Sequence, residues 1–120
     1  MSAQPTEITL HQPSRMLAIT FDDGVCYQFP YEYLRVYSPS ADVSGHTPDE
    51  AVLQVGKKEI GVSEVVAAGS YALQISFDDG HGTGIYTWEY LCQLGKNQTA
   101  LWQDYLDRLA AVGASRESRS

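Results

Sequence analysis

At 120 residues, with 43% apolar and 19% charged side chains, the chain has the composition of one globular domain. Its net charge of −7, with only eight lysine and arginine residues, excludes the clustered basic surface that nucleic acids and anionic membranes require. No apolar run approaches the ~20 residues that span a bilayer, and residues 1–10 lack the basic and apolar regions of a secretory signal. We therefore expect a cytoplasmic protein.

The first third of the chain predicts three strands and a short helix. Alternating or branched apolar residues, followed by a helix-initiating proline, mark these elements at 7–11, 16–21, 25–29 and 30–36. Asp22-Asp23-Gly24 predicts a hairpin turn between the second and third strands. Aspartate accepts local backbone hydrogen bonds there, and glycine adopts the positive φ that a tight turn needs.

The middle of the chain begins with the longest predicted loop. Residues 37–51 are rich in Ser, Pro, Gly, Asp and His, and long loops in compact domains often carry function. Strands and a second helical turn are then predicted at 51–55, 59–66, 71–77, 84–87 and 88–94. In the strand at 71–77, alternation places Tyr71 on the same face as Leu73 and Ile75. Gly95 is expected to end the second helical turn.

An amphipathic helix is predicted at 97–113, with Asn97 or Thr99 as its N-cap and Gly113 as its stop. Residues 114–120 are expected to be disordered. Together the elements predict a single α+β domain, ordered from about 6 to 113. We expect antiparallel β-hairpins in one or two small sheets, covered by short helices and the C-terminal helix.

Two stretches are nearly identical: ITFDDG at 19–24 and ISFDDG at 75–80, each followed by Glu-Tyr-Leu. Each copy predicts strand, acidic turn, strand and short helix. Carboxylates at a solvated hairpin tip lack the burial that tunes them for acid–base chemistry, so we interpret Asp22 and Asp23 as turn residues. The alternative places all four carboxylates around a cation or a reacting water. It is stronger for Asp78 and Asp79, because His81 and several glycines lie beside them.

Three further strings carry a family resemblance: DGHGTGIYTWEYL at 79–91, LRVYSPSA at 34–41 with the following Gly45-His46, and GSYAL at 69–73. In order, over about residues 6–112, they resemble the N-terminal domain of gamma-butyrobetaine hydroxylase. Similar domains of unknown function occur fused to Mrp-type iron–sulfur carrier ATPases and as free-standing bacterial proteins. The resemblance implies a non-catalytic accessory or interaction module whose partner belongs to an iron–sulfur or iron-dependent enzyme system.

The resemblance also bears on metal binding. In the hydroxylase this domain holds a structural zinc through three cysteines and a later histidine. The matching positions here are Ser38, Ser40, Val43 and His81, so three of the four ligands are missing and that zinc site is not expected. The chain also lacks the His-x-Asp of the iron-binding facial triad, so the oxygenase activity does not transfer and no cofactor is firmly assigned.

A metal-binding protein is the alternative function. If the loop after residue 37 packs over the second hairpin, as the relative's zinc arrangement implies, His46 approaches His81. With Asp78 or Asp79, two histidines would suit iron(II), zinc or nickel. Against this, a histidine in a glycine-rich turn is more often a hydrogen-bonding surface residue. A weaker third hypothesis is a small hydrolase that uses these carboxylates and His81.

Aromatic side chains are concentrated in the two return strands and short helices. Most are expected in the core. A surplus exposed near Tyr31, Tyr33 and Tyr37, with Trp88, would form a protein-docking patch, because tyrosine and tryptophan favour interface cores.

The two cysteines, Cys26 and Cys92, lie among apolar neighbours. In a reducing compartment they are expected to remain thiols. We expect both to behave as small buried hydrophobic residues.

Overall fold

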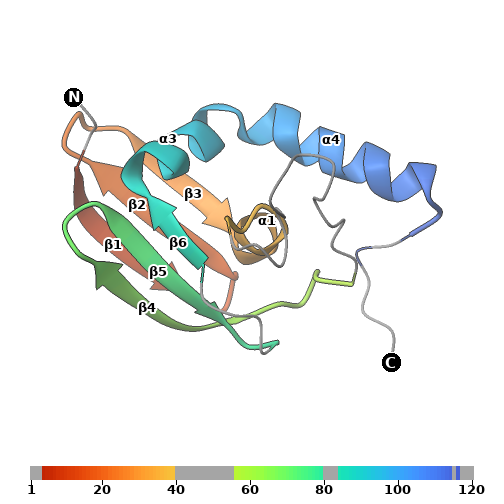
Figure 1. Cartoon of the computed structure of the whole chain (residues 1–120), viewed down its shortest axis with the longest axis horizontal. Coiled ribbons are helices and arrows are strands. Elements are labelled where there is room, and N and C mark those ends of the chain that lie inside the picture. Colours follow the sequence, from red (N-terminus) through yellow and green to blue (C-terminus); the bar gives the residue numbers. More distant parts are fainter. Residues whose placement is uncertain (1–3, 40–55, 80–83, 115, 117–120) are drawn as a thin grey trace.

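The computed structural model describes residues 4–39, 56–79, 84–114 and 116, which form two three-stranded antiparallel sheets and three helices (Figure 1). The first sheet contains β1 (Pro5–His11), β2 (Met16–Phe21) and β3 (Cys26–Pro30). The second sheet contains β4 (Val62–Ala68), β5 (Ala72–Phe77) and β6 (Gly84–Thr87). The helices are α1 (Tyr31–Val36), α3 (Trp88–Lys96) and α4 (Gln98–Ala111). The predicted α+β architecture is confirmed. No helix in this described part is long and apolar enough to span a membrane.

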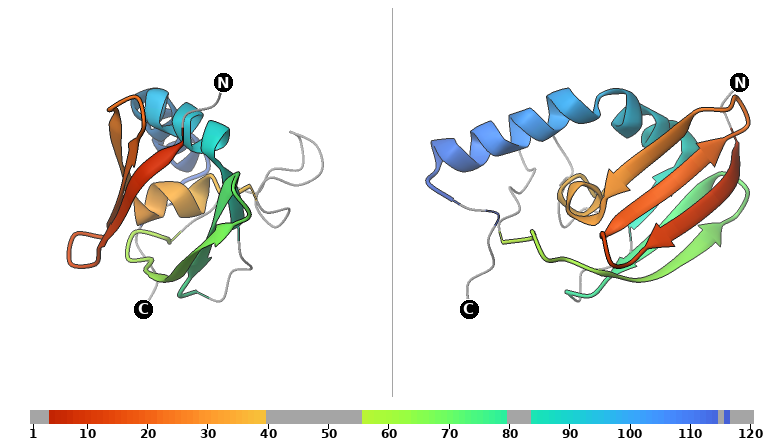
Figure 2. Two further views of the ribbon diagram at one scale, coloured as in Figure 1. Left: turned by 90° about the vertical axis from the view of Figure 1, so that its left-hand side faces the viewer. Right: turned by 180° about the vertical axis from the view of Figure 1, so that it is seen from behind.

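The hydrophobic core lies where the two sheets face each other (Figure 2). Each central strand contributes its inward-facing alternate residues, which are almost completely buried: Leu17, Ile19 and Phe21 from β2, and Leu73, Ile75 and Phe77 from β5. Because both sheets expose their other face, each needs the other to cover its apolar side. Helix α1 lies against this core with all six of its residues buried.

The sequence repeat is a repeat of structure. Each half is a three-stranded meander followed by a helix, and each first strand has a register irregularity near its start. The backbone N–H of Asp22 donates to the Gln4 carbonyl at 2.8 Å, and that of Asp78 donates to the Gly61 carbonyl at 2.9 Å. The repeated sequence is therefore part of the same strand–strand–helix unit in both halves, as predicted, while residues 80–83 of the second turn lie outside the described residues.

The first residues of α1 and α3 are also held in the same way. The N–H of Tyr31 donates to the Arg15 carbonyl at 2.9 Å, and that of Trp88 donates to the Tyr71 carbonyl at 3.1 Å. These bonds tie the first residue of each helix to the loop that precedes the central strand. The backbone N–H groups at helix starts lack intrahelical partners, so the two bonds satisfy donors that would otherwise be unpaired.

Helix α3 runs through Gly95 to Lys96, so the expectation that glycine ends it is wrong. Gly95 instead permits a close approach, because an added Cβ would collide with the ring of Tyr27 from β3. The glycine thus allows α3 to lie directly on an aromatic side chain of the first sheet.

Three other local expectations are wrong. β4 begins at Val62 rather than at residue 59, because the residues before it form a turn in which the Ile60 N–H donates to the Lys57 carbonyl. Tyr71 is 59% exposed, because β5 starts only at Ala72 and its alternation does not include Tyr71. Cys26 is exposed on β3, whereas Cys92 is half-buried against the core. The predicted strand at 51–55 lies outside the described residues.

Tyrosine hydroxyls connect the helices to one another and to the sheets. Tyr33 donates to the Leu94 carbonyl at 2.7 Å, Tyr37 to Leu101 at 2.7 Å, Tyr86 to Leu34 at 2.6 Å and Tyr90 to Tyr37 at 2.5 Å. A buried tyrosine packs its ring as a hydrophobic group while its hydroxyl satisfies a backbone carbonyl. Burial raises the pKa of these phenols above their ordinary value of 10.0.

We expect the protein to lose stability at alkaline pH. Burial raises the pKa of Tyr90 and of Tyr105 to about 12, whereas the same phenols titrate near 10.0 when unfolded. Between these values the unfolded chain binds fewer protons than the native chain, so the free energy of unfolding falls as pH rises. Urea denaturation from pH 7 to 11.5 should show a stable midpoint below about pH 9 and a steady decline above about 10.

Replacing Tyr90 by phenylalanine should lower the free energy of unfolding at pH 7 by about 1 kcal/mol, through loss of the bond to the Tyr37 carbonyl. It should also flatten the alkaline decline. The exposed Tyr71→Phe is the matched control and should leave the neutral midpoint within about 0.5 kcal/mol of the wild type. An unchanged midpoint for both variants would contradict the role given to the Tyr90 hydroxyl.

Candidate functional site

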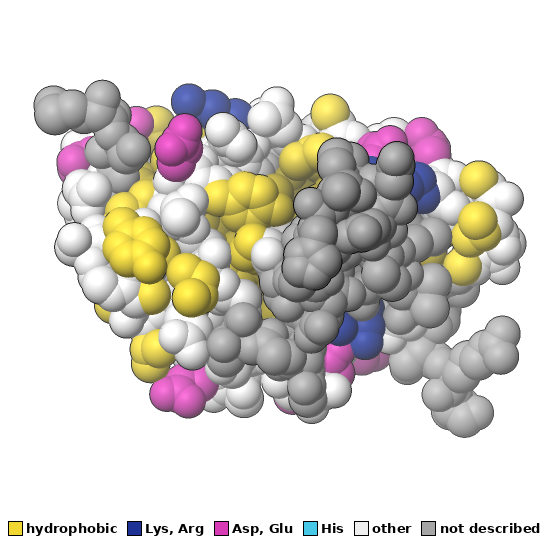
Figure 3. Space-filling model, viewed as in Figure 1, with side chains coloured by type: hydrophobic (Ala, Val, Ile, Leu, Met, Phe, Trp, Pro, Cys, Tyr) yellow, Lys and Arg dark blue, Asp and Glu magenta, His cyan; other side chains and the backbone are white. Residues whose placement is uncertain are grey.

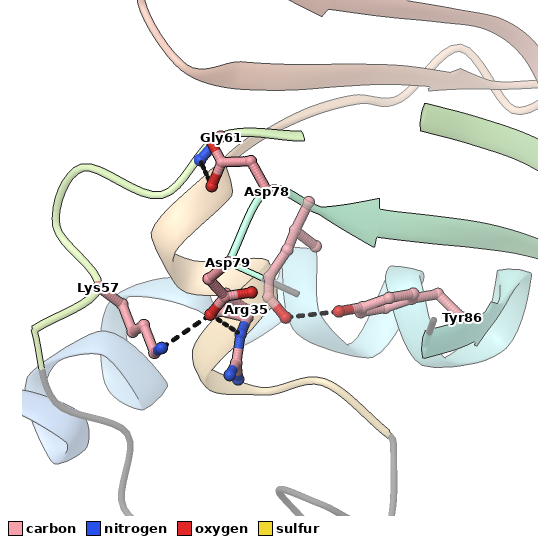
Figure 4. Close-up of polar contacts among 7 residues, drawn as sticks. Arg35, Lys57, Gly61, Asp78, Asp79 and Tyr86 are labelled. Carbon is pink, nitrogen blue, oxygen red and sulfur yellow. Dashed lines mark hydrogen bonds and ion pairs between the residues drawn. The ribbon is translucent and has the colours of Figure 1, made fainter. Parts of the chain in front are cut away.

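The second acidic turn holds a cluster of charged groups from three parts of the chain (Figure 4). Asp79, just after β5, accepts hydrogen bonds through Oδ2 from Arg35 Nε of α1 at 3.0 Å and from Lys57 Nζ at 2.7 Å. All three side chains are largely shielded from solvent, with exposed fractions of 19%, 7% and 22% respectively. Arg35 Nη1 is fully buried and has no hydrogen-bond acceptor among the described residues.

Asp78 has a different role in the same turn. Its Oδ1 accepts a hydrogen bond from the Gly61 N–H at 3.0 Å, while its own N–H donates to the Gly61 carbonyl at 2.9 Å. A Cβ on Gly61 would collide with this carboxylate. The pair of bonds fixes the chain just before β4 against the end of β5, so Asp78 acts as a structural link.

These contacts define what the two carboxylates can do. Asp79 neutralises two adjacent cations, of which Arg35 is nearly buried, and a buried arginine is stable only when paired in this way. A metal ion at Asp79 would have to displace Lys57 or Arg35, and one at Asp78 would compete with the Gly61 N–H. The geometry is that of a structural ion pair beside a backbone clamp.

The proposed metal ligands are only partly placed. Asp78 and Asp79 are adjacent and engaged as above, whereas His46 and His81 lie outside the described residues. Within the described ranges, no three His, Cys, Asp or Glu side chains gather in a group that could hold a metal ion. The iron, zinc or nickel site therefore stays a prediction. Ser38 is buried, and its Oγ would lie 2.8 Å from a Cβ added to Gly84.

The first acidic turn is solvated. Asp22 and Asp23 are exposed, Gly24 has a φ of 85°, and Asp23 Oδ1 accepts a hydrogen bond from the Val25 N–H at 3.0 Å. This turn joins β2 to β3 at the opposite end of the sheets from the end of β5 (Figure 1). The alternative in which all four aspartates surround one ion is wrong, because the two turns do not meet.

The aromatic residues named as docking candidates lie mostly inside the molecule. Tyr31 and Tyr33 are completely buried, Trp88 is buried, and Tyr37 is partly buried. The expectation that they are exposed is wrong for the first three. Each buried ring has a polar partner, as in the bond from Trp88 Nε1 to the Ser70 carbonyl at 2.9 Å. A satisfied polar atom lets tyrosine or tryptophan enter a core at little cost.

An exposed apolar surface lies elsewhere, on the outer face of the second sheet. Val66 of β4 pairs with Gln74 of β5, which pairs with Ile85 of β6, so the three form one row across the sheet. Val66 is 41% exposed and Ile85 46% exposed. We call Val66 and Ile85 the outer apolar patch. The sequence held one signal for it, because consecutive valines at 65 and 66 in a strand cannot both face inward.

The molecule is thus a duplicated α+β domain whose charged cluster stabilises the fold. The model of the gamma-butyrobetaine hydroxylase-like N-terminal family matches residues 8–92, and the chain belongs to this family. No curated protein matches the chain.

Solved structures support the relationship. Two solution structures determined by NMR each share a TM-score of 0.84 with the chain. The first is 45% identical, with 100% of this chain and 94% of that chain covered, and the second is 44% identical, with 99% and 89% covered. A crystal structure from Acidithiobacillus ferrooxidans, of a DUF971-family protein with unknown function, is 40% identical over 77% of this chain and 92% of that chain, with a TM-score of 0.65.

The two acidic turns allow a matched test of the ion cluster. Asp79→Asn removes the charge that pairs with the nearly buried Arg35, and we expect it to lower the free energy of unfolding by about 3 kcal/mol. Asp23→Asn, at the equivalent position of the exposed turn, should change it by less than about 0.5 kcal/mol. Equal midpoints for the two variants in chemical denaturation would show that the Asp79 contacts do not stabilise the fold.

Proposed function

We propose that the protein is a non-catalytic docking module that binds a partner protein through the outer apolar patch. The observation that carries this proposal is the pair of exposed apolar side chains, Val66 of β4 and Ile85 of β6, that lie in one row across the outer face of the second sheet. In Figure 3, hydrophobic side chains are visible over the part of the molecule that these strands occupy in Figure 1, and charged groups lie mainly around them.

The chemistry of the patch favours protein binding. Single exposed apolar residues are common on protein surfaces, but Val66 and Ile85 lie in one row on a rigid sheet. Tyr71, which is exposed just before β5, is an aromatic residue of the kind enriched in interface cores. The patch is small, so the expected interaction is a modest, reversible one that places two proteins together.

The family relationship supports an accessory role beside an enzyme. The family is named for the N-terminal part of gamma-butyrobetaine hydroxylase, an enzyme. The partner we propose is an iron–sulfur or iron-dependent enzyme system. Because the described carboxylates at the second turn serve ion pairing and backbone clamping, the proposal assigns catalysis to that partner.

Ile85→Glu should abolish docking. The variant places a charge at one of the two apolar positions of the patch, and desolvating that charge should weaken partner binding by more than about tenfold. Val112→Glu is the matched control, because Val112 is also exposed but lies beyond the end of α4, on a different element. Proteins captured from the native cell by the wild type would be identified by mass spectrometry. The purified candidate would then be titrated against all three proteins by calorimetry.

The proposal requires that the wild type and Val112→Glu bind the purified partner equally and that Ile85→Glu does not. Circular dichroism melts of the variants establish that each one is folded. Equal binding by Ile85→Glu would remove the patch from the interaction. Turnover of a substrate by the protein alone would overturn the non-catalytic role.

A further inference from the structure

An arginine beyond helix α4 is held in a pocket built from other parts of the chain. Gly113, with a φ of 68°, turns the chain after α4, and the Ala114 N–H bonds back to the Leu109 carbonyl at 2.9 Å. Arg116 then places its guanidinium on Glu32 of α1. Its Nε lies 2.9 Å from Oε2 and its Nη2 lies 2.8 Å from Oε1.

Two further groups complete the pocket. The guanidinium carbon of Arg116 lies 5.1 Å from the centre of the Trp102 ring, within the range of a cation–π contact. The Arg116 carbonyl accepts a hydrogen bond from the Lys58 N–H at 3.0 Å. The pocket thus offers a forked carboxylate, an aromatic face and a backbone donor.

These are the features by which proteins select arginine over lysine. The planar guanidinium matches a carboxylate with two parallel hydrogen bonds and stacks flat on aromatic rings, whereas an ammonium group makes only a point-charge contact with either. The carboxylate is preorganised because Glu32 is almost completely buried, at 6% exposure, on a helix that is itself buried. Arg116 itself remains partly accessible to solvent, because its side chain is 37% exposed.

The energetics favour exchange of the arginine. Removing a cation from a buried carboxylate is strongly unfavourable, so the pocket does not remain empty at low cost. An arginine from another molecule restores the same side-chain contacts, so exchange does not leave the Glu32 carboxylate unpaired. The partly exposed Arg116 side chain is therefore a replaceable occupant.

We propose that Glu32, Trp102 and the Lys58 backbone form a binding pocket for an arginine side chain presented by another protein segment, and that Arg116 is its occupant in cis. The net charge of −7 favours a partner segment that is basic. The pocket is built from α1, α4 and the segment before β4, whereas the outer apolar patch lies on the second sheet. The proposal goes beyond the docking function and does not depend on it.

The test uses the full chain carrying Arg116→Ala, which vacates the pocket, and the blocked tripeptide acetyl-Gly-Arg-Gly-amide as probe. Binding is followed by NMR at the Trp102 indole N–H and the Glu32 amide. We expect saturable shifts at both, with a Kd on the order of 1 mM. The wild type should bind about tenfold more weakly, because Arg116 competes at high effective concentration.

Two controls separate arginine recognition from general charge attraction. The matched peptide acetyl-Gly-Lys-Gly-amide should bind Arg116→Ala about tenfold more weakly than the arginine peptide, because lysine cannot form the fork. The double variant Arg116→Ala/Glu32→Gln should not bind either peptide. If Arg116→Ala does not fold, Arg116→Lys replaces it. That variant keeps a cation in the pocket and should still exchange it for the arginine peptide.

Several results would overturn the proposal. They are an absence of saturable shifts at Trp102 in folded Arg116→Ala or Arg116→Lys, equal binding of the lysine peptide, or equal binding by the wild type. A second copy of this chain could also supply the arginine. Light scattering of the wild type at rising concentration distinguishes that source, because exchange between copies gives a dimer that Arg116→Ala does not form.

Discussion

The complete burial of helix α1 is the constraint on which the rest of the structure depends. A helix of six residues is too short to be stable alone, so its existence requires tertiary packing. The six buried residues include the charged Glu32 and Arg35, and a buried charge must have a partner of opposite charge. Asp79, just after β5, supplies one partner, and Arg116, beyond α4, supplies the other. Two long-range ion pairs thus follow from one short helix, and the proposed arginine pocket is built on one of them.

The repeated hexapeptide shows how one local sequence takes two roles. In both copies the N–H of the first aspartate donates to the carbonyl of the residue just before the first strand of its meander. The first pair of aspartates remains in solvent, whereas Asp79 meets Arg35 and Lys57. Nothing within the six residues distinguishes these outcomes. The difference comes from what packs against each turn, because α1 brings Arg35 to the second turn, whereas its counterpart α3 packs on Tyr27 of the first sheet.

The backbone was largely predictable and the surface was not. Branched and aromatic residues identified β2 over its whole length, and Pro30 marked the start of α1, because both signals are local. Exposure of the aromatic residues depends on tertiary contacts, so Tyr31 and Tyr33 were expected at a surface that they do not reach. Likewise, the Glu32–Arg116 pair joins residues 84 positions apart, and no spacing rule reveals it. The role of His46 and His81 as metal ligands stays a prediction, because both lie outside the described residues.

The twofold design has a consequence for how the chain becomes ordered. Each meander hides its apolar side only against the other, so half of the molecule has no interior of its own. The contacts that close the core join Leu17 and Ile19 to Leu73 and Ile75, far along the sequence. The ribosome must therefore release most of the polypeptide before a stable folding nucleus can form. Truncation near the midpoint leaves an aggregation-prone fragment rather than a smaller folded domain.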